Sequence, residues 1–294
     1  MRMTTRQRLR RALVSASAHL DQFRDDTKRA VSLCYHSIHP AKPFATVSPQ
    51  VFERHLAWLT EHCRVEPLGE ESLGLLSANT DADTSRPLVF LTFDDGYDDN
   101  FDYAFPALMK YGVRATFFLT TGLIERNSST LSRFLRERNC SPDMLKTLDW
   151  GQIREMRSAG MIFGAHTHTH RNLATLDDTA AVEELRLSKA ILEDKLAEPI
   201  RLMAYPYGKP RVHFTFDRTV PLVRDCGYEL AAAVVPRGIR PSDSSFAVPR
   251  FFVARDDVEG LREKVIGRAD VLGWWQEHAP ISVQRLVSPS DFGH

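Results

Sequence analysis

The sequence predicts a parallel α/β protein on three observations. Short apolar runs alternate with longer segments whose apolar residues recur at helical spacing. Residues 88–93 and 115–119 are two such runs, and the helical segment 100–111 between them gives the spacing of a parallel βαβ unit. With 294 residues, the chain can bury a sizeable core as one large domain or two small ones. These observations do not choose between an open sheet and a barrel.

The composition is that of an ordinary soluble globular protein. Hydrophobic residues make up 43% of the chain and the formal net charge is zero, so bulk charge gives no reason to expect nucleic acid as a partner. No run of about 18 apolar residues is present, so we expect no transmembrane segment. The four cysteines are far apart and form no Cys-x-x-Cys pair, which indicates free thiols in a reducing compartment. We therefore expect a cytoplasmic protein.

Residues 1–30 form a predicted N-terminal helical arm that is rich in arginine. The apolar stretch of a secretory signal peptide does not follow these arginines. Leu9, Leu13 and Leu20 fall at helical spacing, and a helix packed on the domain is the favoured interpretation because Asp25 and its neighbours dilute the positive face. The alternative is a basic amphipathic segment that contacts the inner membrane face peripherally.

A catalytic domain is expected over residues 31–275, followed by a tail at 276–294. Its expected elements, in chain order, are a strand at 31–37, a helix from Pro49 to about His62 capped by Ser48, strands at 88–93 and 115–119 with the helix between them, a helix at 150–159, a strand at 161–163, a helix capped by Asp178 that runs to about Leu196, a strand at 201–205, a helix at 217–226, and strands at 229–235 and 247–253. Residues 124–149 are polar and are expected to form an irregular lid or substrate loop.

Two adjacent carboxylates, Asp94 and Asp95, directly follow the apolar run at 88–93. Such a run reads as a strand that is buried on both faces, and Gly96 allows a sharp turn after it. The two carboxylates therefore stand at the carboxyl end of a central strand, where α/β proteins place their sites. Successive side chains of a strand point in opposite directions, so the two can have different roles. An aspartate cap of the next helix is the simpler alternative.

Three of the 11 histidines fall within residues 166–170, after the short apolar run at 161–163. If the segment stays extended, His166 and His168 could chelate an ion, whereas a helical turn would bring His166 and His170 to one face. Both spacings suit Zn²⁺, which accepts imidazole nitrogen and carboxylate oxygen. The alternative is a polar loop with surface histidines.

Three segments together resemble the polysaccharide deacetylases, the NodB-like carbohydrate esterase family 4. They are Thr92–Tyr97 (Thr-Phe-Asp-Asp-Gly-Tyr), His166–His170 (His-Thr-His-Thr-His) and Tyr205–Gly208 (Tyr-Pro-Tyr-Gly). Tyr35-His36 at the end of the first strand resembles the opening of one branch of this family. The resemblance covers residues 31–255 approximately and implies a distorted, incomplete (β/α)7 barrel.

The resemblance also implies roles for individual residues. Asp95, His166 and His170 would hold a divalent metal, most suitably Zn²⁺, with Co²⁺, Ni²⁺ or Fe²⁺ as alternatives. Asp94 would be the general base, and the backbone N–H of Tyr207 would stabilise the oxyanion. His168 would point away from the metal.

Two departures from the family pattern concern the base and the acid. The arginine that orients the base often stands two residues before the proline of the third motif, where this chain has Ala204. Arg250 could supply that arginine, and a surface position for it is the alternative. The late histidine motif that supplies the catalytic acid is also absent, because His278 lacks the expected neighbours. In the branch that opens with Tyr-His, His36 could take that place.

These features predict a metal-dependent hydrolase that removes N-acetyl groups from amino sugars of a polysaccharide, oligosaccharide or glycolipid. Two alternatives remain open at this point. The first is a related amidohydrolase with a non-polymeric substrate, such as a deformylase or a cyclic-amide hydrolase. The second is an inactive carbohydrate-binding relative. The sequence does not identify the sugar, the linkage or the oligomeric state.

Overall fold

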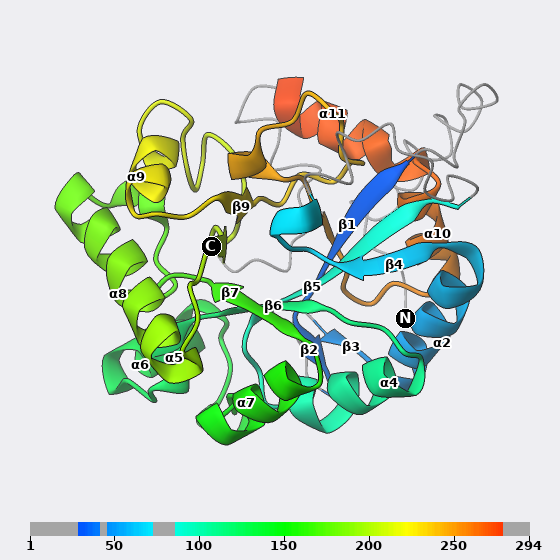
Figure 1. Ribbon diagram of the computed structural model, residues 1–294, viewed down its shortest axis with the longest axis horizontal. Coiled ribbons are helices and arrows are strands. Elements are labelled where there is room, and N and C mark those ends of the chain that lie inside the picture. The colour runs from blue at the N-terminus through cyan, green and yellow to red at the C-terminus, as the bar shows by residue number, and fades with distance from the viewer. Residues whose placement is uncertain (1–28, 42–45, 73–85, 279–294) are drawn as a thin grey trace.

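One curled sheet of parallel strands organises the protein, with helices packed around its outside (Figure 1). The structure is a computed structural model that describes residues 29–41, 46–72 and 86–278. Along the sheet the strands follow the order β10 (Phe251–Phe252), β1 (Ala30–Tyr35), β5 (Leu88–Asp95), β6 (Thr116–Leu119), β7 (Ile162–Ala165), β8 (Leu202–Ala204) and β9 (Leu230–Ala232). This confirms the predicted incomplete, seven-stranded barrel.

Strand β5 is the centre of the sheet, and all eight of its residues are buried. β1 pairs with it along one edge from Ala30 to Tyr35. On the other edge, β4 (Arg64–Pro67) pairs with its first half and β6 with its second half. Because neighbours cover both edges and helices cover the faces, this strand can be apolar throughout until it reaches its carboxyl end. Strand β4 was not predicted from the sequence.

The segment 248–252 joins the two ends of the sheet. The amide of Val248 donates to the carbonyl of Ala231 at 2.9 Å, beside β9. Three residues later, Phe251 pairs with Leu33 of β1. The last strand of the chain therefore lies against the first strand, and the sheet curls enough to bring these distant segments together. A small second sheet pairs β2 (Ser37–Ile38) with β3 (Thr46–Val47).

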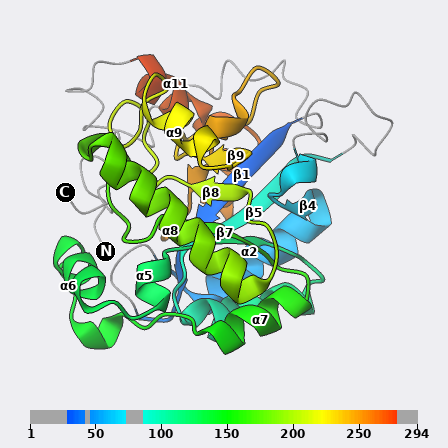
Figure 2. The same ribbon diagram turned by 60° about the vertical axis from the view of Figure 1, so that its left-hand side comes forward.

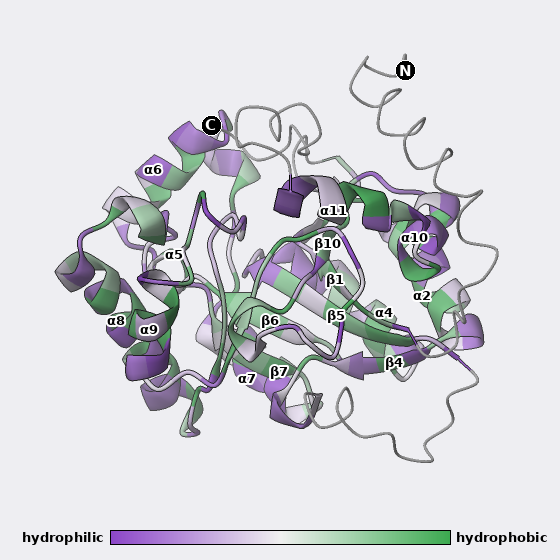
Figure 3. Cartoon of the chain, turned by 90° about the horizontal axis from the view of Figure 1, so that it is seen from above, coloured by the Kyte–Doolittle hydropathy of each residue, from purple (hydrophilic) through white to green (hydrophobic). Residues whose placement is uncertain are grey.

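Helices surround this sheet, and α8, the longest helix in the described part of the chain, crosses in front of β7 in Figure 2. The α-helices are α2 (Pro49–His62), α4 (Phe105–Lys110), α5 (Thr121–Ile124), α6 (Ser128–Glu137), α7 (Trp150–Ser158), α8 (Asp178–Leu196), α9 (Thr219–Asp225), α10 (Val258–Val265) and α11 (Val271–His278). Short π or 3₁₀ segments occur at Asn100–Ala104, Pro142–Met144, Leu173–Thr175, Ser245–Ala247 and Arg268–Asp270. Figure 3 shows that β5 and β6 are hydrophobic, whereas the surrounding helices carry both hydrophobic and hydrophilic residues. Most of the apolar core therefore lies between sheet and helices.

Local capping explains where several helices begin. Ser48 accepts a hydrogen bond from the amide of Val51 at the start of α2, and Pro49 occupies the first helical position, as predicted. The start of α8 corrects one prediction. Asp177, rather than Asp178, is the cap, and its carboxylate accepts from the amide of Ala180 at 2.8 Å. The acceptor of a cap must precede the first helical residue, and Asp178 is already helical.

The sequence predicted an irregular loop over residues 124–149, and this prediction is wrong for part of the segment, which is helical. Asn127 caps α6, which runs from Ser128 to Glu137 and lies beside α5. The predicted arm at 1–30 and the tail at 276–294 lie largely outside the described residues, so these boundaries stay predictions. In the described part of the chain, no helix is both long and apolar enough to span a membrane.

Candidate active site and metal centre

The predicted site residues meet at the carboxyl ends of the strands. Asp94 and Asp95 end β5, His36 follows β1, and His166 follows β7. All four side chains are buried. Because parallel strands share one direction, their carboxyl ends lie along the same edge, and segments 130 residues apart in sequence can contribute to one site. This is the arrangement that the sequence pattern predicted.

The backbone is left-handed at four non-glycine residues of this region. The φ angles are +76° at Asp95, +62° at Thr167, +58° at His170 and +61° at Tyr207. A non-glycine residue in this conformation is destabilised by about 1 kcal/mol or more and persists only where the surroundings enforce it. Such residues gather at functional sites. The backbone at the ends of β5, β7 and β8 therefore adopts an unfavourable conformation that fixes the directions of the Asp95, His170 and Tyr207 side chains.

Gly208 shows how closely the turn after β8 packs. Its φ is +64°, and a Cβ atom added there would lie 2.7 Å from the amide nitrogen of Val234. That amide donates to the carbonyl of Gly208 at 2.7 Å. Any other residue at this position would push the turn away from Val234, and the preceding Tyr207 would move with it.

Three ligand atoms converge on one point. Oδ1 of Asp95 lies 3.3 Å from Nε2 of His170 and 3.6 Å from Nε2 of His166. The three atoms lie within 4.8 Å of one another. Of the two spacings considered for the histidine segment, the structure therefore brings His166 and His170 together. It leaves His168 half-buried, with its Nδ1 atom 2.9 Å from the hydroxyl of Thr121.

Hydrogen bonding decides which atoms of this cluster are free to bind a cation. Nδ1 of His166 lies 2.8 Å from the carbonyl of Ala204, so it carries the proton and Nε2 presents a lone pair. Burial, followed by the nearby charge of Arg138, lowers the pKa of His170 well below its usual range, so this ring is neutral. Its Nδ1 atom has no hydrogen-bond partner among the residues described, so no such bond fixes its tautomer.

The donor set fits a divalent metal. Oδ1 of Asp95 is buried and has no hydrogen-bond partner in the described part of the chain. Leaving a buried carboxylate oxygen without a donor is costly, and a bound cation would satisfy it. Two imidazole nitrogens and one carboxylate oxygen are a donor set that Zn²⁺ accepts, with further positions left for water or substrate. Asp95, His166 and His170 could therefore hold such an ion.

Asp94 is paired with a buried arginine instead. Arg250 donates from Nη1 to Oδ1 of Asp94 at 2.7 Å and from Nη2 to Oδ2 at 2.8 Å. It also donates to the hydroxyl of Thr92 and the carbonyl of Ala233. Arg250 is fully buried, so the alternative of a surface position for it is wrong. The structure thus places Arg250 where it would orient Asp94.

The pKa of Asp94 follows from this pairing. Burial alone raises the pKa of the carboxyl group, but the charge and hydrogen bonds of Arg250, with His166 and His36, lower it by more. The net result is a pKa well below the usual range of an aspartate, so Asp94 is ionised at neutral pH.

Removing Arg250 should strongly destabilise the fold at neutral pH. Arg250→Met leaves Asp94 as an unpaired buried charge, and breaking a buried ion pair in this way costs about 3–5 kcal/mol. The folded-state pKa of Asp94 is depressed, so the pairing stabilises the protein above the unfolded-state pKa of about 4, and this stabilisation is lost as the pH falls further. Urea unfolding at pH 7 and pH 3 should therefore show a smaller difference between wild type and variant at pH 3. Equal stability at pH 7 would contradict the pairing.

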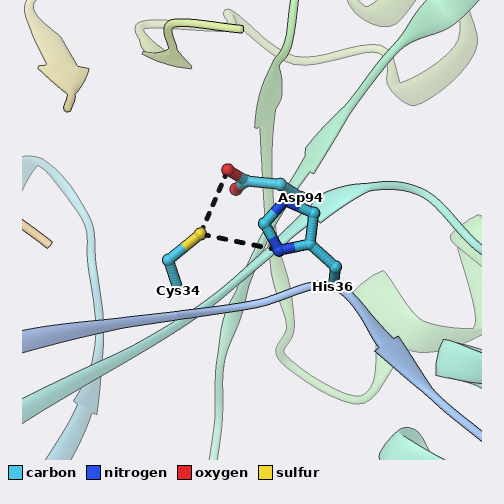
Figure 4. Close-up of side chains that lie close together, drawn as sticks. All are labelled: Cys34, His36 and Asp94. Carbon is cyan, nitrogen blue, oxygen red and sulfur yellow. Dashed lines mark hydrogen bonds between the residues drawn. The ribbon is translucent and has the colours of Figure 1, made fainter. Parts of the chain in front are cut away.

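Cys34 and His36 flank Asp94 from β1 and the residue after it (Figure 4). The thiol of Cys34 donates to Oδ2 of Asp94 at 3.3 Å, and its sulfur lies 3.9 Å from Nδ1 of His36. Burial lowers the pKa of His36, and the carboxylates of Asp95 and Asp94 oppose this effect. From the sequence, Cys34 was expected only to be a buried free thiol. Its two-residue spacing from His36, which puts both on one face of a strand, was the available signal.

Tyr207 packs against His170, one of the candidate ligands. Its ring centroid lies 4.8 Å from that of His170, and its hydroxyl donates to Oε2 of Glu137 at 2.8 Å. The side chain therefore packs against a candidate ligand and joins the end of α6 to the site. The role of its backbone amide remains a prediction.

Arg138 is a site residue that sequence reasoning missed. It follows the last residue of α6, and its Nη2 atom donates to Oδ2 of Asp95 at 3.3 Å. Its guanidinium carbon lies 3.3 Å from the ring centroid of Phe134. The only signal in the sequence was an arginine-rich stretch within residues 124–149, which does not distinguish a site residue from a solvated one.

Known proteins resemble this chain in sequence and in fold. The polysaccharide deacetylase family model matches residues 81–231. YxkH of Bacillus subtilis, a candidate polysaccharide deacetylase by its name, is 26% identical over 222 residues, which cover 76% of this chain and 70% of YxkH. The poly-beta-1,6-N-acetyl-D-glucosamine N-deacetylase of Staphylococcus aureus is 23% identical over 227 residues, 74% of this chain and 70% of the relative.

A solved structure agrees with these matches. The deacetylase PplD of Streptococcus pyogenes, in complex with acetate, superposes with a TM-score of 0.67 at 26% identity, covering 81% of this chain and 98% of PplD. These likenesses do not address the branch that opens with Tyr-His, which stays a prediction. The family match spans more than half of the chain and includes both aspartates and the histidine cluster. The chain therefore belongs to the polysaccharide deacetylase family, whose members hydrolyse the C–N bond of amides.

Proposed function

We propose that this protein removes N-acetyl groups from amino sugars of a polysaccharide, oligosaccharide or glycolipid with the help of a divalent metal. The observation that carries the proposal is the pair of adjacent carboxylates in different environments. Oδ1 of Asp95 faces two histidine nitrogens and has no hydrogen-bond donor among the described residues. Both carboxylate oxygens of Asp94, in contrast, accept hydrogen bonds from Arg250. One carboxylate is thus available to a cation, and the other is kept ionised beside it.

Asp95, His166 and His170 would hold the metal, with Zn²⁺ as the first candidate. When bound, such an ion polarises the amide carbonyl and activates a water molecule. Asp94 is not part of that ligand set, and its Oδ2 atom lies 3.9 Å from Nε2 of His166. It can therefore accept the proton of the attacking water, while Arg250 holds the carboxylate in one orientation.

His36 would donate a proton to the leaving amine. Its ring lies next to Asp94, since the ligand atoms of Cys34, His36 and Asp94 lie within 4.8 Å of one another (Figure 4). Burial lowers the pKa of this ring, whereas the carboxylates of Asp95 and Asp94 favour its protonated form, which is the form that can donate. The backbone N–H of Tyr207 would donate to the developing oxyanion.

We expect His36→Asn to reduce acetate release by about 10²- to 10⁴-fold, the usual contribution of a general acid. Metal content should stay unchanged, because His36 is not among the proposed ligands. An acetate ester with a good leaving group needs no protonation, so its hydrolysis should lose much less. His278→Asn, at an exposed histidine of α11, is the matched control. Full activity of the His36 variant on the amide would refute the assignment.

The function itself is tested on the wild-type protein. It should be purified without chelator, its metal content measured by elemental analysis, and acetate release assayed with β-1,6- and β-1,4-linked N-acetylglucosamine oligomers. About one metal ion per chain together with acetate release would support the proposal. Metal without acetate, but with formate from N-formylated sugars, would replace it with the deformylase alternative. Absence of metal, with no activity after zinc addition, would overturn it and favour a binding protein.

The substrate class remains part of the proposal. The Staphylococcus aureus relative is named for poly-beta-1,6-N-acetyl-D-glucosamine, which makes β-1,6-linked oligomers the first substrates to assay. A soluble or lipid-linked sugar at the inner membrane face would suit the predicted cytoplasmic location. The arm that would contact the membrane lies outside the described residues.

A further inference from the structure

The end of α6 brings a second buried arginine to the site. Arg138 lies in the segment between β6 and α7, and only 13% of its side chain is exposed. Its guanidinium group stacks on Phe134 of the preceding turn, and Nη2 donates to Oδ2 of Asp95. Asp95 thus presents one oxygen to the histidines and the other to an arginine.

Arg138 changes the charge that a metal ion would meet. Asp94 is already neutralised by Arg250 through two hydrogen bonds. Among the residues described, the positively charged side chain that pairs with Asp95 is that of Arg138. The formal charges of the two carboxylates and the two arginines cancel. A divalent cation would therefore enter a buried site whose formal charge is already balanced.

Glu137 compensates this charge only in part. One of its carboxylate oxygens lies 4.0 Å from Nη1 of Arg138, and 29% of its side chain is exposed. The same oxygen accepts from the hydroxyl of Tyr207. Its charge is therefore more strongly screened by water than the buried pair of Arg138 and Asp95.

We propose that Arg138 is a positioning residue of the metal site that occupies Oδ2 of Asp95 and lowers the affinity of the site for a divalent ion. This inference rests on the proposed metal role of Asp95, His166 and His170. The hydrogen bond leaves Oδ1 as the oxygen that can ligate, and the positive charge opposes the incoming cation. In the metal-free protein, the same charge stabilises the buried carboxylate.

The hydrogen bond and the charge have opposite effects on affinity, so variants can separate them. Loss of an outer-shell hydrogen bond weakens metal binding by about 10- to 100-fold. Loss of a like charge in a buried site strengthens binding. Charge repulsion at low effective dielectric outweighs the hydrogen bond here, because that bond is long, at 3.3 Å. Arg138→Gln removes the charge and retains an N–H donor. Arg138→Lys retains the charge.

The experiment titrates the chelator-treated full-length chain with Co²⁺ alone and follows its visible absorption, with a competing chelator to fix the Kd. For Arg138→Gln and Arg138→Met, the Kd for Co²⁺ should be at least about tenfold lower than for wild type. Arg138→Lys should stay within about threefold, since it keeps the charge. Arg136→Met, an exposed arginine of the same helix, is the matched control and should bind as wild type does.

Thermal unfolding supplies a second readout. In EDTA, Arg138→Gln should melt at a lower temperature than wild type, because the buried carboxylate of Asp95 then lacks the positive charge of Arg138. Saturating Co²⁺ should then raise its melting temperature by more than it raises that of wild type. A merely structural role would lower the melting temperature without tightening Co²⁺ binding.

The outcomes separate this inference from the proposed function. If wild type binds Co²⁺ and Arg138→Gln binds it equally or more weakly, the inference is overturned and the metal site stands. If Arg138→Lys binds as tightly as Arg138→Gln, charge is not the cause and the inference also fails. If wild type binds no Co²⁺, the metal site fails and the inference fails with it.

Discussion

Asp94→Asn should lose nearly all deacetylase activity and still bind metal. An amide cannot accept the proton of the attacking water, and loss of a general base costs about 10²- to 10⁴-fold in rate. We expect the upper end of this range, because two hydrogen bonds from Arg250 hold the carboxylate of Asp94 in one orientation. The measurement is kcat for acetate release alongside metal content.

Asp102→Asn is the matched control for this variant. It makes the same chemical change at an exposed position of the segment after β5, so it should keep wild-type activity. Asp94→Asn also leaves Arg250 buried without its anion, so its folding must be checked by urea unfolding at pH 7. A folded, metal-loaded Asp94→Asn variant with substantial activity would exclude Asp94 as the base.

His170→Ala should lose the metal. Loss of an outer-shell partner weakens metal binding by about 10- to 100-fold, and removing one of the three proposed direct ligands should weaken it by more. Activity should fall with it and return only in part at high metal concentration. Equilibrium dialysis with Zn²⁺ would measure the loss directly.

His168→Ala distinguishes the two geometries that the histidine segment allows. This side chain pairs with Thr121 and is not one of the three clustered ligand residues, so its removal should leave metal affinity close to wild type. If His168→Ala loses metal and His170→Ala retains it, the extended arrangement of the segment is correct and the ligand set proposed here is wrong.

Local patterns in the sequence were sufficient to place the central site residues. The apolar run of β5 ends where Asp94 and Asp95 begin, and the run of β7 ends just before His166. In a parallel sheet, strand ends gather at one edge regardless of the order of the strands. For this reason, residues that directly follow strands could be placed without knowing which strands are neighbours.

The positions of Arg250 and Arg138 could not be predicted in the same way. Arg250 reaches Asp94 because the segment 248–252 lies between β9 and β1, which depends on how far the sheet curls. No periodicity in the sequence reports that curvature. Arg250 was considered only because the family resemblance required an arginine that Ala204 does not supply. Arg138 depends on α6, whose serines and arginines hid its helical pattern within a polar stretch.

The pairing of Arg250 with Asp94 also bears on the order in which the site forms during synthesis. Every proposed metal ligand lies before residue 171, whereas the partner of the base arrives with the last strand of the sheet. A nascent chain that ends before Pro249 would contain Asp95, His166 and His170 but would expose Asp94 without its cation. The proposed metal ligands are therefore synthesised before the partner of Asp94, and closure of the sheet by β10 is the folding event that brings Arg250 to Asp94.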